Sequence, residues 1–137
     1  MLIKAFILAC KAHKGQKDKA GKPYILHPVY VAMHTKGVKR KTVALLHDIV
    51  EDTEITFLDL AQMGFDDEIV QAVKAITKRK NERYGEYLIR VKQNPIAKDV
   101  KIADIKHNSD LGRLKFATLK DFERAEKYHI AMEYLCS

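Results

Sequence analysis

The chain has few cysteines, and the two it has are far apart. Only Cys10 and Cys136 occur in 137 residues, without the C-x-x-C spacing of metal-binding knuckles. This argues against a zinc knuckle and against a disulfide framework. Sparse cysteine usage of this kind is typical of a reducing compartment, so we expect a cytoplasmic protein.

Long apolar runs and linker-like stretches are also missing. No apolar run approaches the length of a membrane span. In the N-terminal segment MLIKAFILAC, Lys4 interrupts the apolar residues, which instead mark one face of an amphipathic helix. No repeat or Pro/Gly/Ser-rich segment divides the chain, which is long enough to bury a core. We therefore expect one soluble domain, residues 1–137, with no membrane partner.

Period-two alternation of polar and apolar residues is absent as well, so the predicted fold class is all-α. Two capping boxes, Thr56 with Asp59 and Thr118 with Asp121, predict helix starts. Apolar periodicity and breakers predict helices over about residues 2–14, 28–36, 39–51, 56–64, 66–78, 84–93, 96–114 and from 118 onward.

The net charge of +7 favours a polyanionic partner, such as a nucleotide, a nucleic acid or an anionic surface. The alternative is that the lysines only solvate helix faces. Aromatic residues are not interleaved with the lysines as a stacking platform for nucleic acid requires. The charge is therefore best matched by a small phosphorylated partner, and it leaves the oligomeric state open.

The stretch LLHDIVEDT (45–53) places ionisable residues among apolar ones, where they are costly unless paired. His47 and Glu51 are four residues apart, as are Asp48 and Asp52, so each pair shares a helix face. Adjacent His47 and Asp48 point about 100° apart around a helix. That angle suits two ligands approaching one ion, and imidazole with carboxylate fits manganese, iron or zinc better than calcium. The alternatives are a hydrogen-bonded core histidine and a solvated acidic pair.

Polar residues outside this stretch show related patterns. Asp104 and Asn108 are four apart near the C-terminal end of a long helical pattern, and His27 directly precedes Pro28. Glu51 and Asp52 lie one turn beyond His47 and Asp48, which makes them candidate general bases for a metal-held water.

Four separate blocks together resemble one known family: AHKGQ (12–16), GKPYILHP (21–28), ALLHDIVEDTEIT (44–56) and VKIADIKHN (100–108). They are similar to the HD-domain metal-dependent phosphohydrolases, and most of all to the (p)ppGpp hydrolase domain of RelA/SpoT-type enzymes and its small stand-alone relatives. The resemblance covers about residues 3–114. It implies an all-α bundle with a central metal site, and an activity that is hydrolytic only, because no synthetase domain fits in the remaining residues.

The resemblance also assigns roles to individual positions. It implies that a divalent ion, typically Mn²⁺ with Fe²⁺, Zn²⁺ or Mg²⁺ as alternatives, is held by His27, His47, Asp48 and Asp104. It implies that Glu51 and Asp52 orient or deprotonate the attacking water. Lys19 and Asn108 match positions that contact the nucleotide, and Lys17 is a further candidate to counter the charge of substrate phosphates.

Two positions depart from the family pattern. Asp18 stands where the family usually carries a basic residue, and Ala20 stands where it carries a small hydroxyl residue. We therefore expect complete metal and water machinery beside an altered nucleoside pocket. The leading hypothesis is a (p)ppGpp 3′-pyrophosphohydrolase. The alternatives are a hydrolase of another nucleotide or phosphorylated cofactor, and a non-catalytic nucleotide or nucleic-acid binding module.

Overall fold

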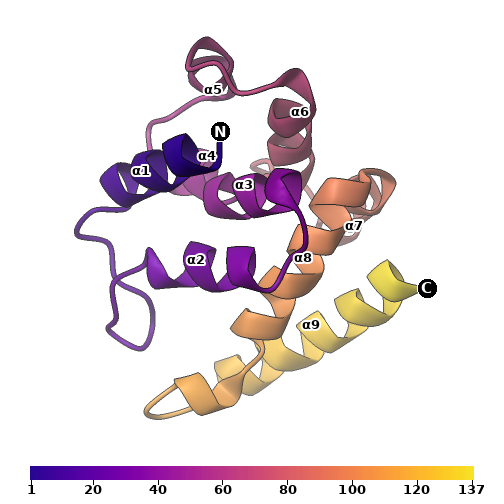
Figure 1. Ribbon diagram of the computed structural model, residues 1–137. Helices are drawn as coiled ribbons and strands as arrows, with labels where there is room; N and C mark the ends of the chain where they lie inside the picture. The colour runs from indigo at the N-terminus through magenta and orange to yellow at the C-terminus, as the bar shows by residue number, and fades with distance from the viewer.

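The computed structural model describes residues 1–137 and is helical almost throughout (Figure 1). The all-α prediction is confirmed, and the only β contact is an isolated antiparallel bridge between Lys17 and Pro23. The elements are α1 (Leu2–Ala12), α2 (Leu26–Met33), α3 (Val38–Leu46), α4 (Ile49–Asp52), α5 (Phe57–Gln62), α6 (Asp67–Ile76), α7 (Tyr84–Gln93), α8 (Pro95–Asn108), the 3₁₀ turn η1 (Leu111–Arg113) and α9 (Leu119–Cys136).

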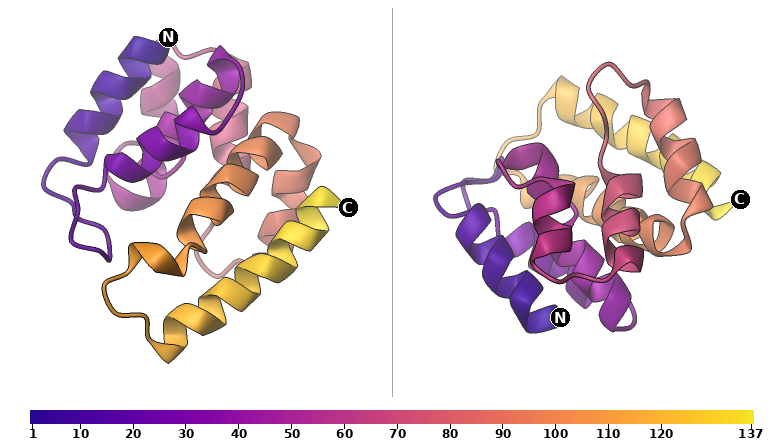
Figure 2. Two further views of the ribbon diagram at one scale, coloured as in Figure 1. Left: turned by 60° about the horizontal axis from the view of Figure 1, so that its bottom comes forward. Right: turned by 90° about the horizontal axis from the view of Figure 1, so that it is seen from above.

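Helix α8 is the centre of the bundle. It contacts α2, α3, α6, α7 and α9, and Figure 2 shows it running between the α2–α3 pair and α9. One continuous apolar core lies along it, formed by side chains that include Leu46, Ile49, Val73, Val100 and Ile105. The inward face of α8 therefore meets α2 and α3 in the interior of the molecule.

Local signals account for most helix starts. The predicted capping boxes are present at both sites, with the Thr56 and Thr118 side chains each accepting from the N–H three residues on. Helix α8 begins where the Asn94 side chain accepts from the Ala97 N–H, and Pro95 occupies the first turn, where its missing N–H has no helical role.

Two predicted boundaries beside the His/Asp residues differ from the structure. Helix α2 begins at Leu26 rather than after His27, so His27 lies inside the first turn. Helix α8 ends at Asn108 rather than near residue 114. Arg113 Nη1 donates to the His107 carbonyl in its last turn (2.9 Å), and the Asp110 side chain accepts from the Gly112 N–H (3.0 Å), which starts η1 directly after it.

The predicted helix over residues 39–51 is broken at His47 and Asp48 into α3 and α4. The Ala44 carbonyl, which would accept from the Asp48 N–H in a continuous helix, instead faces His47 Nδ1 at 2.5 Å and accepts from the His47 N–H at 3.5 Å. Because the histidine side chain takes this carbonyl, the helix path is interrupted between the two candidate ligands.

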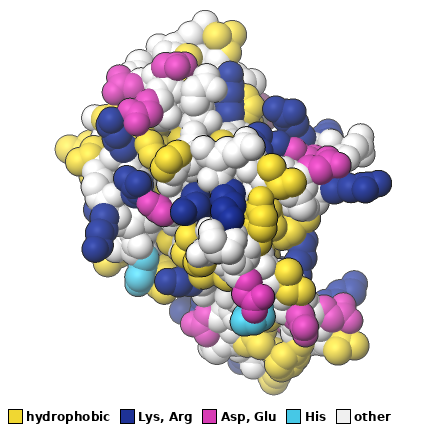
Figure 3. All heavy atoms as spheres, turned by 90° about the vertical axis from the view of Figure 1, so that its right-hand side faces the viewer, with side chains coloured by type: hydrophobic (Ala, Val, Ile, Leu, Met, Phe, Trp, Pro, Cys, Tyr) yellow, Lys and Arg dark blue, Asp and Glu magenta, His cyan; other side chains and the backbone are white.

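On the molecular surface, basic and apolar side chains are interspersed over the face shown in Figure 3, without a single continuous basic stripe on that face. None of the helices combines the length and the apolar character that crossing a membrane requires.

Candidate functional site

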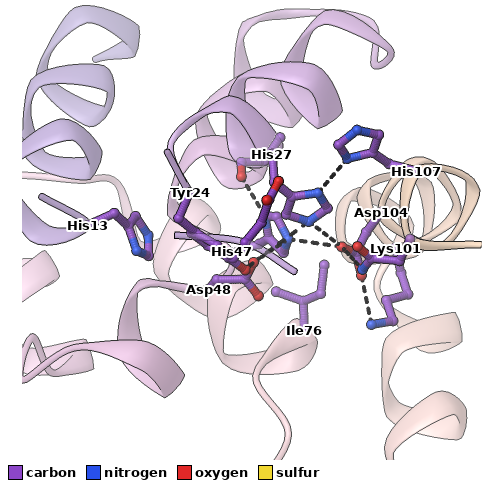
Figure 4. Close-up of polar contacts among 12 residues, drawn as sticks. His13, Tyr24, His27, His47, Asp48, Ile76, Lys101, Asp104 and His107 are labelled. Atoms are coloured by element: carbon purple, nitrogen blue, oxygen red, sulfur yellow. Dashed lines mark hydrogen bonds and ion pairs between the residues drawn. The ribbon is translucent and has the colours of Figure 1, made fainter. Parts of the chain in front are cut away.

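Two histidines and two aspartates converge in the interior from three parts of the chain (Figure 4). His27 comes from α2, His47 and Asp48 from the break between α3 and α4, and Asp104 from α8. One ligand atom from each of the four lies within 4.8 Å of the others. His27 Nε2 is 2.7 Å from Asp104 Oδ1, and His47 Nε2 is 3.1 Å from Asp48 Oδ2 and 3.3 Å from Asp104 Oδ1. The structure thus brings together the four predicted metal-site residues.

In both histidines, a hydrogen bond made by Nδ1 determines that Nε2 is the nitrogen facing the cluster. His47 Nδ1 lies 2.5 Å from the Ala44 carbonyl, which only accepts, so this nitrogen carries the proton. His27 Nδ1 lies 2.6 Å from His107 Nδ1. Burial, together with the nearby Arg113 guanidinium, lowers the pKa of His107 to about 4, which keeps this ring neutral and able to accept. Both Nε2 atoms then face the cluster, and Nε2 is the atom that would bind a metal when Nδ1 is hydrogen-bonded elsewhere.

This arrangement fits a divalent ion. Two imidazole nitrogens and two carboxylates face one another at short distances, and a cation between them offsets the repulsion between the two carboxylates. In the protein without an ion, burial opposes protonation of His47, but Asp48 and Asp104 outweigh this effect and raise the pKa of His47 well above its usual value. The two carboxylates are therefore compensated either by a bound cation or by a proton on His47. A mixed nitrogen and oxygen donor set suits a transition-metal ion such as manganese, iron or zinc.

Lys101 belongs to the site and was not identified from the sequence. Its Nζ donates to Asp104 Oδ2 at 2.9 Å, while Asn108 Nδ2 donates to Asp104 Oδ1 at 3.0 Å. Burial alone would lower the pKa of Lys101, but Asp104 raises it well above the usual lysine value. Burial would in turn raise the pKa of Asp104, but Lys101 and the histidines outweigh it and hold that pKa well below its usual range. The i,i+3 spacing was the available signal.

Tyr24 is a second residue missed by sequence reasoning, although it lies inside the block GKPYILHP. Its hydroxyl donates to Asp48 Oδ2 at 2.5 Å (Figure 4). Burial and the Asp48 charge raise the pKa of Tyr24, so it remains a donor at any physiological pH. Each aspartate of the cluster is thus oriented by a hydrogen bond from outside it.

The two predicted catalytic acids lie beside the cluster on α4, on different sides. Glu51 Oε1 accepts from the Lys78 N–H at 2.6 Å and lines a cleft with Lys74, Lys78, Arg79 and Lys80. Asp52 lies on the side of His13 and Gln16. Partial loss of water raises the pKa of both carboxyl groups above their usual values, and the Asp48 charge adds to the effect. Neither acid makes a direct hydrogen bond to the four ligand side chains.

The predicted substrate-binding residues share one cavity. Lys17, Lys19 and Asn108 line a cavity of about 380 Å³ that reaches His27 of the His/Asp cluster. The loop before α2 forms one wall, and Gly21, at φ 81°, allows its tight turn. The remaining lining residues include Arg113, Leu114, Arg124 and Tyr128, which sequence reasoning missed because they lie outside the recognisable blocks.

An all-helical bundle that directs two histidines and two aspartates at one buried point defines a class of metal-binding helical domains. The chain belongs to the HD domain family, whose model matches residues 5–134. The resemblance inferred from the four sequence blocks is therefore confirmed at the level of the family.

Several characterised proteins are similar to the chain. The bifunctional (p)ppGpp synthase/hydrolase SpoT of Escherichia coli K12 is 32% identical over 130 residues, covering 83% of this chain and 18% of SpoT. The guanosine-3′,5′-bis(diphosphate) 3′-pyrophosphohydrolase of Aquifex aeolicus is 30% identical over 113 residues, covering 74% of this chain and 16% of the relative. The chain thus spans less than a fifth of the length of these relatives.

A solved structure has the same fold. It is that of a metazoan ortholog of SpoT described as hydrolysing ppGpp, and it superposes with a TM-score of 0.78 at 23% identity, covering 98% of this chain and 82% of that chain.

Proposed function

We propose that the chain hydrolyses a phosphorylated nucleotide in the presence of Mn²⁺, and that the first candidate substrate is guanosine 3′,5′-bis(diphosphate). The observation that carries this proposal is the junction of two features: a buried His/Asp cluster that fits a divalent ion, and a cation-lined cavity that reaches one of its histidines. The names of the relatives support the choice of substrate, since one is a 3′-pyrophosphohydrolase of this compound.

In the proposed reaction, water attacks the phosphorus of the 3′-diphosphate, the bond from that phosphorus to the ribose 3′ oxygen breaks, and GDP and pyrophosphate are released. His27, His47, Asp48 and Asp104 hold the ion. When bound, the ion lowers the pKa of a water that it holds and neutralises charge on a phosphoryl oxygen. The 3′ oxygen of the leaving nucleoside takes up a proton.

The acids of α4 are the proposed general bases. Partial burial raises the pKa of both carboxyl groups, which makes each a stronger base toward a proton of water than an ordinary exposed carboxylate. Lys17 and Lys19 neutralise the charge of the substrate phosphates, and Asn108 contacts the sugar region of the nucleotide.

A different phosphorylated nucleotide or cofactor is the second candidate. Asp18 and Ala20 both line the cavity, so the residues that depart from the family pattern lie where a nucleoside would be contacted. The metal site and the bases are the same in this alternative, and only the compound that fits the cavity differs.

Hydrolysis of a nucleotide panel with added Mn²⁺, resolved by anion-exchange chromatography, tests the proposal. The panel contains guanosine 3′,5′-bis(diphosphate), its adenosine counterpart, NADPH and common mononucleotides. We expect GDP and pyrophosphate from the first compound, and no turnover by His47→Ala. His129→Ala is the matched control, because His129 is exposed and pairs only with Glu133 on its own helix. Turnover by a metal-free Asp48→Ala protein would overturn the mechanism.

A further inference from the structure

Both carboxylate oxygens of Asp18 contact other groups of the protein. Oδ1 accepts from the Ala20 and Lys22 N–H groups, both at 2.9 Å, and Oδ2 lies 3.4 Å from Arg113 Nη2. Only 11% of the side chain is exposed. Because both oxygens are engaged, Asp18 shapes the loop and binds an arginine, and it has little capacity left for a ligand.

Arg113 is held at two points. It belongs to η1, and its Nη1 donates to the His107 carbonyl at 2.9 Å while Nη2 faces Asp18. With a quarter of its side chain exposed, it lines the same cavity as Lys17 and Lys19. A guanidinium is planar with its donors in a fixed fork, so these contacts fix the direction in which its remaining donors point.

The surroundings of Arg113 suit a base better than a phosphate group. Its charge is already paired with Asp18, whereas Lys17 makes no ion pair and Lys19 only a long one, 3.8 Å to Asp121. Leu114 and Tyr128 bring apolar surface to the same cavity. The lysines therefore remain available to phosphates, and the cavity that Arg113 lines combines its flat cation with apolar side chains.

We propose that Arg113, positioned by Asp18, contacts the base of the bound nucleotide and selects guanine over adenine. Arginine offers only donors. The O6 and N7 atoms of guanine are both acceptors and match its fork, whereas adenine places an amino donor beside N7. The inference rests on the proposed function in one respect, namely that the ligand is a nucleotide.

Calorimetric titration of the manganese-loaded protein with GDP and with ADP tests this selection directly. We expect the wild type to prefer GDP, and Arg113→Ala and Arg113→Lys each to weaken GDP binding by about tenfold or more, the scale of a bidentate contact to a base. ADP binding should change by less than about twofold, since a donor facing an amino group contributes little. Arg40→Ala is the matched control, because Arg40 pairs with Asp99 away from the cavity.

Asp18→Asn separates positioning from direct contact. Its amide oxygen keeps the two backbone hydrogen bonds, so the loop retains its shape, but the charge that holds Arg113 is lost. If Asp18 acts through Arg113, the Asp18→Asn/Arg113→Ala double variant binds GDP no more weakly than Arg113→Ala alone.

Three results overturn the inference: equal weakening of GDP and ADP binding by Arg113→Ala, which means contact with a phosphate; full GDP preference in Arg113→Lys; or additive losses in the double variant. The binding assay does not require turnover. A protein that binds GDP selectively through Arg113 but hydrolyses none of the panel refutes the proposed function and leaves this inference standing.

Discussion

Replacing Lys101 by methionine leaves the Asp104 carboxylate buried without its ammonium partner, which is 2.9 Å away and 13% exposed in its side chain. Removing one member of a buried ion pair costs about 3–5 kcal/mol of folding free energy. For a chain of this size, a loss in the middle of that range lowers the melting temperature by roughly 14 °C. We expect this loss in the metal-free protein.

The ion changes this expectation. A divalent cation at the cluster compensates the Asp104 charge, so Mn²⁺ should stabilise Lys101→Met more than it stabilises the wild type. Thermal unfolding with EDTA and with saturating Mn²⁺ measures both shifts, and Lys106→Met, an exposed lysine on the same helix, is the control. Equal losses of melting temperature with and without Mn²⁺ would refute the argument that Lys101 and the ion compensate the same charge.

Three further predictions concern the metal site and its bases. His47→Ala and Asp48→Ala should each abolish Mn²⁺ binding and turnover together, so stoichiometric manganese by elemental analysis in either protein would contradict the ligand assignment. Glu51→Ala should retain the ion but lose about 10²-fold in turnover. Because the pKa of Glu51 is raised above 4.5, wild-type turnover should fall as the pH drops through that raised value, and Glu51→Gln should lack this pH dependence. Tyr24→Phe should weaken Mn²⁺ binding by about tenfold in calorimetry, since it removes the hydrogen bond that orients Asp48, and an unchanged affinity would count against that role.

Local chemistry explains which parts of the fold were predictable. The capping boxes at Thr56 and Thr118 are read over four residues, and both are present. The break after Leu46 could not be predicted in this way. The His47 side chain competes for the Ala44 carbonyl, while the apolar periodicity of the segment continues across the break. Periodicity alone therefore predicts one helix where the structure has two.

The candidate site shows the same division. The four predicted metal-site residues lie in blocks that are recognisable in the sequence, and the structure brings them together. The pairing of Asp18 with Arg113 joins residues that are 95 positions apart and both outside those blocks, and no local pattern signals it. The departure at Asp18 was visible in the sequence, but its partner was not.

The distances along the chain between the predicted ligands bear on the kinetics of folding. His27 and Asp104 are 77 residues apart, and His47 and Asp104 are 57 apart, so these donors meet only after α2, α3 and α8 have assembled. An unfolded chain has no preformed site, and closing such long loops carries a large entropic cost before any ion is held. A bound ion therefore contributes mainly after the rate-limiting barrier: it should lengthen the lifetime of the native state by slowing unfolding, while the rate of refolding depends little on its concentration.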